Sequence, residues 1–444
     1  MGIVFKISVG SLKIHNRNTV LVIIGIALSI AMAVISCRFG LALLDFRDNY
    51  TVHEYVLENG INTASLTDET LRGIIEYTRQ GDDIYFFVLC VVTLLIALGV
   101  FGSISSISGI LTINSGQKAK TLSVLSTLGA DIKHQAELLA FDALIISIVA
   151  VPLGVALGIF LSYPLINSFT GAFYTNSGLL GYDSLPWYTD SFTDNLFLYC
   201  VGFILMGLAA IFAASFSPVL RLFKNSSVEI AKTSDAINIS LKQTLTDKIA
   251  VKIFGIAGRL ASQNFTNNRK KFRVISRSMS VCALMFILFS LWKAYTSQFN
   301  RDISEDKSIS ATFFVFYVFA FIIFILAFLG TCSLFYVNFN KRKPEFAMLL
   351  SMGMDRGQLY RMTAVESVYY GIYMLLYIVV GSFVIDFVVF SAYKLLDDRY
   401  YFTYPWSEMA FALIIVVVIT FILSLFMTSS VRKINITDEL KKNY

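Results

Sequence analysis

The chain alternates long apolar stretches with short polar segments along its whole length. Eight of these stretches reach the roughly 20 residues that a helix needs to cross a bilayer. Several exceed that minimum, so tilting or projection beyond the membrane is expected. The pattern predicts an all-α polytopic membrane protein with about eight transmembrane helices. Their approximate limits are 19–44, 84–113, 137–165, 194–220, 274–296, 310–339, 363–392 and 408–428.

Composition and charge add an orientation to this pattern. Only 15% of the residues are charged and 56% are hydrophobic, whereas soluble proteins carry roughly 25% charged residues. Most of the 36 Lys and Arg residues fall in alternate polar segments that include both termini. The positive-inside rule therefore predicts a multi-pass protein of the bacterial cytoplasmic membrane with both termini cytoplasmic.

The outside segments are predicted to be small. The first, 45–83, is acidic and contains "LTDETLRGIIEYTRQG" (66–81), which predicts one amphipathic helix capped by Thr67 or Asp68. Nothing outside is long enough to form a separate domain with its own core.

The second half of the chain repeats the first. At a spacing of 224 positions, Gly353 matches Gly129 and Glu366 matches Asp142. Each half contains one span, an outside segment and three more spans, and because four is even, both halves insert the same way. We therefore predict two parallel four-helix repeats related by a pseudo-twofold axis along the membrane normal. The expected limits are 1–232 for the first repeat, 233–265 for a cytosolic linker and 266–444 for the second repeat.

Two polar segments on the predicted cytosolic side carry apolar residues at helical spacing. They read "AKTLSVLSTLGADIKHQAEL" (119–138) and "KPEFAMLLSMGMDRGQLYRM" (343–362). Each apolar stripe is followed by a glycine, which commonly ends a helix in the left-handed conformation. Such a stripe suits docking into a groove of a partner, and the alternative is an amphipathic elbow on the membrane surface beneath its own helices. The residues of these stripes and their glycines are Leu122, Leu125, Leu128, Gly129, Phe346, Leu349, Leu350 and Gly353.

At these segments the chain resembles the FtsX-like (MacB/LolC-type) permeases of bacterial ABC transporters. "RKPEFAMLLSMGM" and "QKAKTLSVLSTLGA" follow that family's pattern of a basic residue, Glu, aliphatic residues and a Leu-Gly or Met-Gly pair. The resemblance implies that the residues above, together with Glu345, couple this chain to an ATPase. Glu345 would cap the helix or pair with an Arg of the partner. In the first repeat Thr121 stands in place of the Glu, and short segments (45–83 and 297–309) replace the large extracellular domain of many relatives.

Five ionisable residues lie within or near the predicted spans. Asp142 and Glu366 begin the third span of each repeat, where we expect pairing with a neighbouring Arg or a helix end. Asp386 lies deeper and is a candidate for a polar contact between helices. Arg38 and Lys293, near the outer ends of their spans, are expected to snorkel to the interface.

No enzyme signature is present in the sequence. It contains no GxxxxGK[ST], HExxH or GxSxG motif, and its His and Cys residues have no metal-ligand spacing. We therefore expect no catalytic residue and no cofactor in this chain, with ATP and Mg bound by a separate ATPase. Since one chain supplies two coupling segments, two ATPase subunits per chain are expected. The basic cluster at 267–273 suits anionic lipid rather than nucleic acid.

The resemblance implies a transport mechanism without a wide central channel. The expected activity is export or removal of an amphipathic peptide, an antimicrobial or a lipid-like molecule. One alternative is a mechanotransmitting or signalling protein that activates an outside enzyme or a sensor such as a sensor kinase. Another is an ion-driven secondary transporter, which parallel repeats also permit, although ionisable pairs are few at the predicted membrane centre.

Overall fold

The computed structural model describes residues 16–61, 67–79, 83–117, 129, 131–175, 190–224, 245–296, 298, 307–396 and 398–429. All regular secondary structure within these ranges is helical. Each apolar stretch predicted from the sequence falls on one long helix. These helices are α2 (Asn16–Glu58), α4 (Asp83–Gln117), α6 (Ile132–Thr175), α8 (Leu196–Lys224), α10 (Leu245–Thr296), α12 (Lys307–Ser351), α13 (Arg356–Leu396) and α14 (Trp406–Ser429).

Length and hydropathy make this a multi-pass membrane protein. Six of the described helices are long and apolar enough to cross a bilayer, namely α2, α4, α6, α8, α10 and α13. In α12 the apolar part that the structure describes is the shorter stretch Phe321–Gly330. The fold class is therefore all-α and membrane-spanning, as the apolar pattern predicts.

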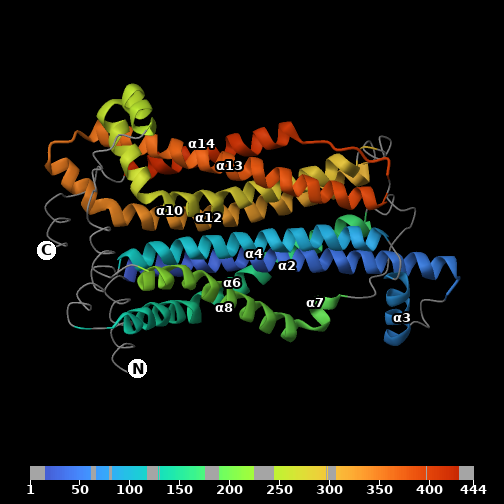
Figure 1. The fold of residues 1–444 in the computed structure, drawn as a ribbon. Helices are drawn as coiled ribbons and strands as arrows, with labels where there is room; N and C mark the ends of the chain where they lie inside the picture. The colour runs from blue at the N-terminus through green and yellow to red at the C-terminus, as the bar shows by residue number, and fades with distance from the viewer. Residues whose placement is uncertain are drawn as a thin grey trace.

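The eight long helices form two groups of four (Figure 1). One group contains α2, α4, α6 and α8, and the other contains α10, α12, α13 and α14. Within each group the first helix packs against the second and the third, and the third packs against the fourth. Between the groups, α2 packs against α12 and α10 packs against α4. These contacts of one group thus have counterparts in the other, which is the arrangement expected of a repeat.

Burial separates central helices from outer ones. The α2 side chains are buried around nearly the whole helix from Gly25 to Gly40. Small residues let the central helices approach closely: Ser333 Oγ of α12 donates to the Leu21 carbonyl oxygen of α2 at 2.7 Å, and Ser29 Oγ of α2 donates to Ser106 Oγ of α4 at 2.9 Å. By contrast, α6, α8, α13 and α14 expose large apolar side chains. In a membrane these faces contact lipid.

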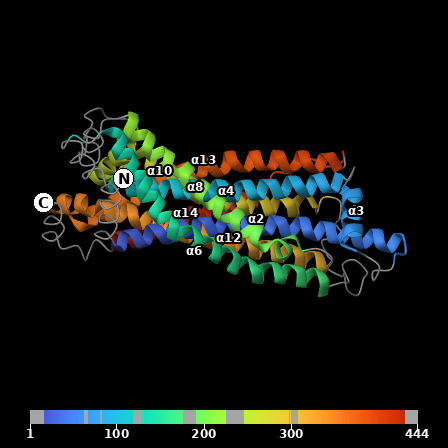
Figure 2. The same ribbon diagram turned by 90° about the horizontal axis from the view of Figure 1, so that it is seen from below.

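One end of the helix bundle carries an extension of α2. At about 1.5 Å per residue its 43 residues span about 65 Å, roughly twice the hydrocarbon thickness of a bilayer. The short helix α3 (Asp68–Arg79) lies across the projecting part of α2 (Figures 1 and 2). Leu71 of α3 packs there against Val52 and Val56. We call this end of the bundle the α3 end and the opposite one the α12–α13 end.

The helix predicted at 66–81 is therefore confirmed. Thr67 precedes α3 and exchanges hydrogen bonds with Thr70: the Thr67 amide donates to Thr70 Oγ1 at 2.8 Å, and the Thr70 amide donates to Thr67 Oγ1 at 3.4 Å. This reciprocal pattern satisfies amides that have no partner within the first turn of the helix.

The structure corrects the limits of two predicted segments. Residues 245–265, assigned from sequence to the linker, belong to α10, while 225–244 lie outside the described residues. Gly255 has a left-handed backbone (φ 66°) within α10, so the helix changes direction there. Residues 345–351 are not a separate short helix, because they continue α12 without interruption. The turn that follows connects α12 directly to α13.

Candidate functional site

A cluster of polar residues joins three helices of the second repeat near the α12–α13 end. We call it the Arg342 cluster. Its members are Asn264 of α10, Arg342, Glu345 and Phe346 of α12, and Glu366 of α13.

Arg342 makes most of the contacts in this cluster. Its Nη1 donates to Glu366 Oε2 at 2.6 Å and its Nη2 donates to Glu366 Oε1 at 2.9 Å. Its Nε donates to Glu345 Oε2 at 3.2 Å. Asn264 Nδ2 donates to Glu366 Oε1 at 2.7 Å. A two-pronged Arg–carboxylate pair fixes orientation as well as distance, so α12 and α13 are held in one register.

The electrostatics of the cluster favour charged groups despite their burial. The Arg342 side chain is 14% exposed and that of Glu366 is 5% exposed. Burial lowers the pKa of Arg342, but the charge and hydrogen bonds of Glu366, followed by the charge of Glu345, raise this pKa above its ordinary value. Arg342 is therefore a permanent cation, and removing Glu366 would leave its charge largely uncompensated.

The apolar stripe of 345–352 does not face outward as a whole. Phe346 is fully buried, its ring centroid lies 5.6 Å from that of Phe339, and the guanidinium of Arg342 lies 4.8 Å from its ring centre. Leu349 and Leu350 are partly buried against the core. In this structure the continuous α12 turns Phe346 toward its own bundle, and a contact of this side chain with a partner stays an untested prediction. Glu345 pairs with Arg342 of the same chain rather than with a partner.

At the end of α12, two methionines that the stripe did not include are exposed. Met348 is 46% exposed and Met352 is 70% exposed. Gly353 follows them with a φ of 93°, and the Gly353 and Met354 amides donate to the carbonyl oxygens of Leu350 and Leu349. These bonds close the end of α12 in the manner of a left-handed glycine cap. The turn therefore presents a defined, partly apolar surface.

The matching segment of the first repeat is only partly described. Leu122, Leu125 and Leu128 lie outside the described residues. Gly129 has a φ of 87°, close to the 93° of Gly353. Asp142, the counterpart of Glu366, is 3% exposed. The two repeats thus share the left-handed glycine and the buried acidic residue.

Two polar contacts at equivalent positions connect the first and third helices of the repeats. In the second repeat Tyr295 Oη of α10 donates to Asp386 Oδ1 of α13 at 2.8 Å. In the first repeat Arg38 Nη1 of α2 donates to Ser162 Oγ of α6 at 3.1 Å, and Ser162 precedes Asp386 by the same 224 positions. The contact of Asp386 is of the interhelical kind expected for that residue.

Arg38 does not snorkel as the sequence suggested. It is 4% exposed, and its guanidinium lies 3.7 Å from the centre of the Phe192 ring. Phe192 belongs to α7 (Ser191–Asp194), a one-turn helix capped by the Asp190 side chain. Because this turn packs against α2 beside Arg38, the guanidinium contacts an aromatic face instead of water. Lys293, by contrast, is exposed.

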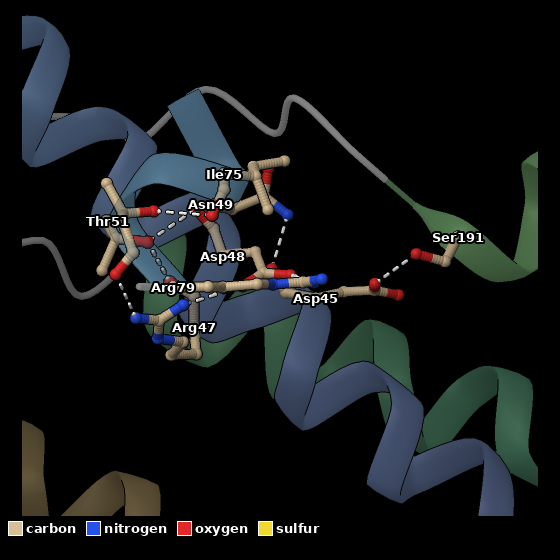
Figure 3. Close-up of polar contacts among 9 residues, drawn as sticks. Asp45, Arg47, Asp48, Asn49, Thr51, Ile75, Arg79 and Ser191 are labelled. Atoms are coloured by element: carbon tan, nitrogen blue, oxygen red, sulfur yellow. Dashed lines mark hydrogen bonds and ion pairs between the residues drawn. The ribbon is translucent and has the colours of Figure 1, made fainter. Parts of the chain in front are cut away.

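A second charged cluster, which the sequence analysis did not identify, holds α3 on α2 (Figure 3). Asp48 of α2 forms an ion pair with Arg79 of α3 and accepts a hydrogen bond from Arg47 Nη1 at 3.1 Å. Arg47 Nη2 also donates to the Thr78 carbonyl oxygen at 3.4 Å. Nearby, Ser191 Oγ of α7 donates to Asp45 Oδ1 at 2.5 Å. Asp45 and Asp48 are spaced by one helical turn, which is the signal that could have indicated a shared face.

Two segments of the chain match a known protein family. Residues 93–227 and 317–436 match the family described as FtsX-like permease C-terminal. Together the two segments cover more than half of the chain, and one contains Gly129 while the other contains Gly353. The chain belongs to the FtsX-like permease family, with one copy of the family's domain in each repeat. Neither the comparison with curated proteins nor that with solved structures gave a match.

Proposed function

We propose that this chain is the membrane subunit of a bacterial ABC transporter, located in the cytoplasmic membrane with both termini inside. ATP and Mg would be bound by separate ATPase subunits, and the work would be export or removal of an amphipathic peptide, an antimicrobial or a lipid-like molecule. The observation that carries this proposal is the duplicated family match, each copy of which includes a helix-ending glycine.

The surface offered to an ATPase is the turn between α12 and α13. At about 1.5 Å per residue the 45 residues of α12 span about 68 Å, more than the roughly 30 Å of bilayer hydrocarbon. An end of α12 that projects from the membrane would leave Met348 and Met352 in water. Flexible methionines suit a groove in a partner protein. The contact that we propose is therefore made by the methionines rather than by Phe346.

The test begins with a search of the neighbouring genes for an ATP-binding-cassette ATPase, which is then expressed together with this chain. Co-expression should give a complex that hydrolyses ATP faster than the ATPase alone, and Met352→Asp should weaken the complex while the permease still inserts into the membrane. Native mass spectrometry should show one permease chain with two ATPase subunits. Two permease chains per complex would contradict that stoichiometry. Cargo movement that follows a proton gradient instead of ATP would contradict the proposal itself.

A signalling role is the second candidate, and the arrangement of α2 and α3 favours it. One helix runs from within the bundle past the membrane and carries α3 at its far end. Motion of α2 would therefore move α3 directly. Removing α3 while cargo resistance and the activity of an outside enzyme are measured separately would distinguish the two roles: loss of the second alone would favour signalling.

A further inference from the structure

The Arg342 cluster lies directly behind the turn that the proposed function assigns to the ATPase. From Arg342 to Ser351 the helix α12 is uninterrupted, a distance of about 14 Å along its axis. Phe346 is fully buried on the bundle side of this stretch. Pro344, which has no backbone N–H to donate, lies within this stretch. A displacement of the turn would therefore reach Arg342 through helical backbone and not through a loop.

The Arg342 cluster connects α12 to two other helices. Glu366 accepts two hydrogen bonds from Arg342 and connects to α13. Asn264 donates to the same carboxylate and connects to α10. Next to this cluster, the Tyr370 and Phe272 rings stack at 4.3 Å, and Ser276 Oγ donates to the Tyr370 carbonyl oxygen at 3.2 Å, so α10 and α13 are in close contact there.

We propose that Arg342 and Glu366 are positioning residues that transmit movement of the α12–α13 turn to α10 and α13, without contacting the ATPase themselves. The inference rests on the proposed function, because the movement must come from an ATPase. A charged pair suits this role, since it resists both sliding and rotation of one helix against another. Coupling between distant sites requires such a chain of packed and bonded groups.

The first repeat contains a weaker version of this pair in its sequence. At the spacing of 224 positions, Lys118 stands for Arg342 and Asp142 for Glu366. Lys118 lies outside the described residues, and Asp142 is buried. A lysine ammonium is a point charge without the planar fork of arginine, and Asp is one methylene shorter than Glu. We therefore expect the second repeat to transmit a larger part of the movement of its turn than the first repeat does.

The experiment uses the full permease–ATPase complex in nanodiscs and compares three variants with wild type. Glu366→Gln keeps the size of the side chain but removes its charge. Arg342→Lys combined with Glu366→Asp places in the second repeat the pair that the first repeat carries. Lys394→Gln is the matched control, because it removes an exposed charge from α13 far from both the cluster and the α12–α13 turn. Each sample is assayed for the amount of bound ATPase and for permease-stimulated ATP hydrolysis.

We expect Glu366→Gln to retain the ATPase at the wild-type level while stimulated hydrolysis falls by about tenfold, within the usual range of coupling between sites. The Lys–Asp pair should lose about threefold, since a charge pair remains, and the control should match wild type. A monodisperse Glu366→Gln complex with wild-type subunit ratios shows that the loss does not reflect unfolding. If the Glu366→Gln complex is not monodisperse, the inference is tested with the Lys–Asp variant instead, whose expected result is the threefold loss of stimulated hydrolysis.

Two results would overturn the inference while leaving the proposed function intact. One is loss of bound ATPase in parallel with stimulation, which would make the pair part of the docking surface. The other is wild-type stimulation in both cluster variants, which would show that movement bypasses Arg342. A wild-type chain that binds no ATPase is a separate result, which overturns the proposed function and the inference together.

Discussion

The two repeats have the same helix packing but close their α3 ends with different chemistry. In the first repeat that end is charged: Arg38 stacks on Phe192, and Asp48 pairs with Arg79. In the second repeat two contacts at that end use neutral donors: Tyr295 Oη donates to Asp386 Oδ1 at 2.8 Å, and Gln298 Nε2 donates to the Tyr401 carbonyl oxygen at 3.0 Å. Duplication therefore preserved which helices touch, while the groups that hold the ends together diverged. Because different groups hold the two ends, we expect the two repeats to respond differently to the same displacement.

The charged end of the first repeat should be the most sensitive to a single change. In Asp48→Ala, Arg47 would lose a carboxylate while its side chain remains only 5% exposed, and breaking a buried pair costs about 3–5 kcal/mol. We expect α3 to detach from α2, detected as loss of amide hydrogen-exchange protection in 68–79. The control is Glu76→Ala, an exposed position on α3, which should change stability by less than about 0.5 kcal/mol. Unchanged protection of α3 in Asp48→Ala would contradict this account of the cluster.

The contact between the first and third helices should tolerate an added methyl group less well in the first repeat than in the second. A Cβ on Gly154 would lie 2.7 Å from the Ala27 carbonyl oxygen, which is backbone and cannot move aside. A Cβ on Gly381 would lie 2.6 Å from Leu284 Cδ1, the far end of a flexible side chain. Gly154→Ala should therefore cost about 2 kcal/mol and Gly381→Ala less than about 1 kcal/mol. Thermal unfolding in detergent measures both, and equal melting temperatures would show that α2 and α6 can separate without cost.

The polar contacts at the equivalent positions 162 and 386 provide the next comparison. Tyr295→Phe removes the hydrogen bond to Asp386, whose side chain is fully buried and whose Oδ2 has no hydrogen-bond partner. An unsatisfied buried carboxyl costs about 1–3 kcal/mol. Ser162→Ala should cost less, about 1 kcal/mol, because Arg38 keeps its contact with Phe192.

Thermal unfolding distinguishes the loss of a hydrogen bond from the loss of packing at Tyr295. Tyr295→Phe combined with Asp386→Leu removes both polar groups, so it should be more stable than Tyr295→Phe alone. A double variant less stable than the single one would indicate that Asp386 has another partner in the membrane-embedded protein.

The helices and their grouping follow from hydrophobic periodicity, and so they could be predicted from the sequence. Each apolar stretch became one helix, and α3 formed where its amphipathic pattern and Thr67 indicated. The extra length of α2 and α10 could not be predicted in this way, because those extensions are polar helices held by tertiary contacts such as Asp48–Arg79. The segment 343–362 could be recognised from its pattern, but the sequence could not show which of its side chains are exposed, and its role in coupling stays a prediction. Spacing identifies which residues share a stripe, yet only packing decides that Phe346 faces Phe339 and Met352 faces outward.

The last comparison concerns the two glycines that end the proposed coupling segments. Gly129 and Gly353 have φ values of 87° and 93°, and no atom of the residues that the structure describes lies within 4 Å of a Cβ built on either. The cost of Gly129→Ala or Gly353→Ala is therefore only that of placing an L-residue in a left-handed conformation, about 1–2 kcal/mol. Because that cost is local, both variants should fold and bind the ATPase, and permease-stimulated ATP hydrolysis then reports how much each turn matters. A larger loss from Gly353→Ala would agree with the stricter link through Arg342, whereas a larger loss from Gly129→Ala would make the first repeat the main receiver of the motion.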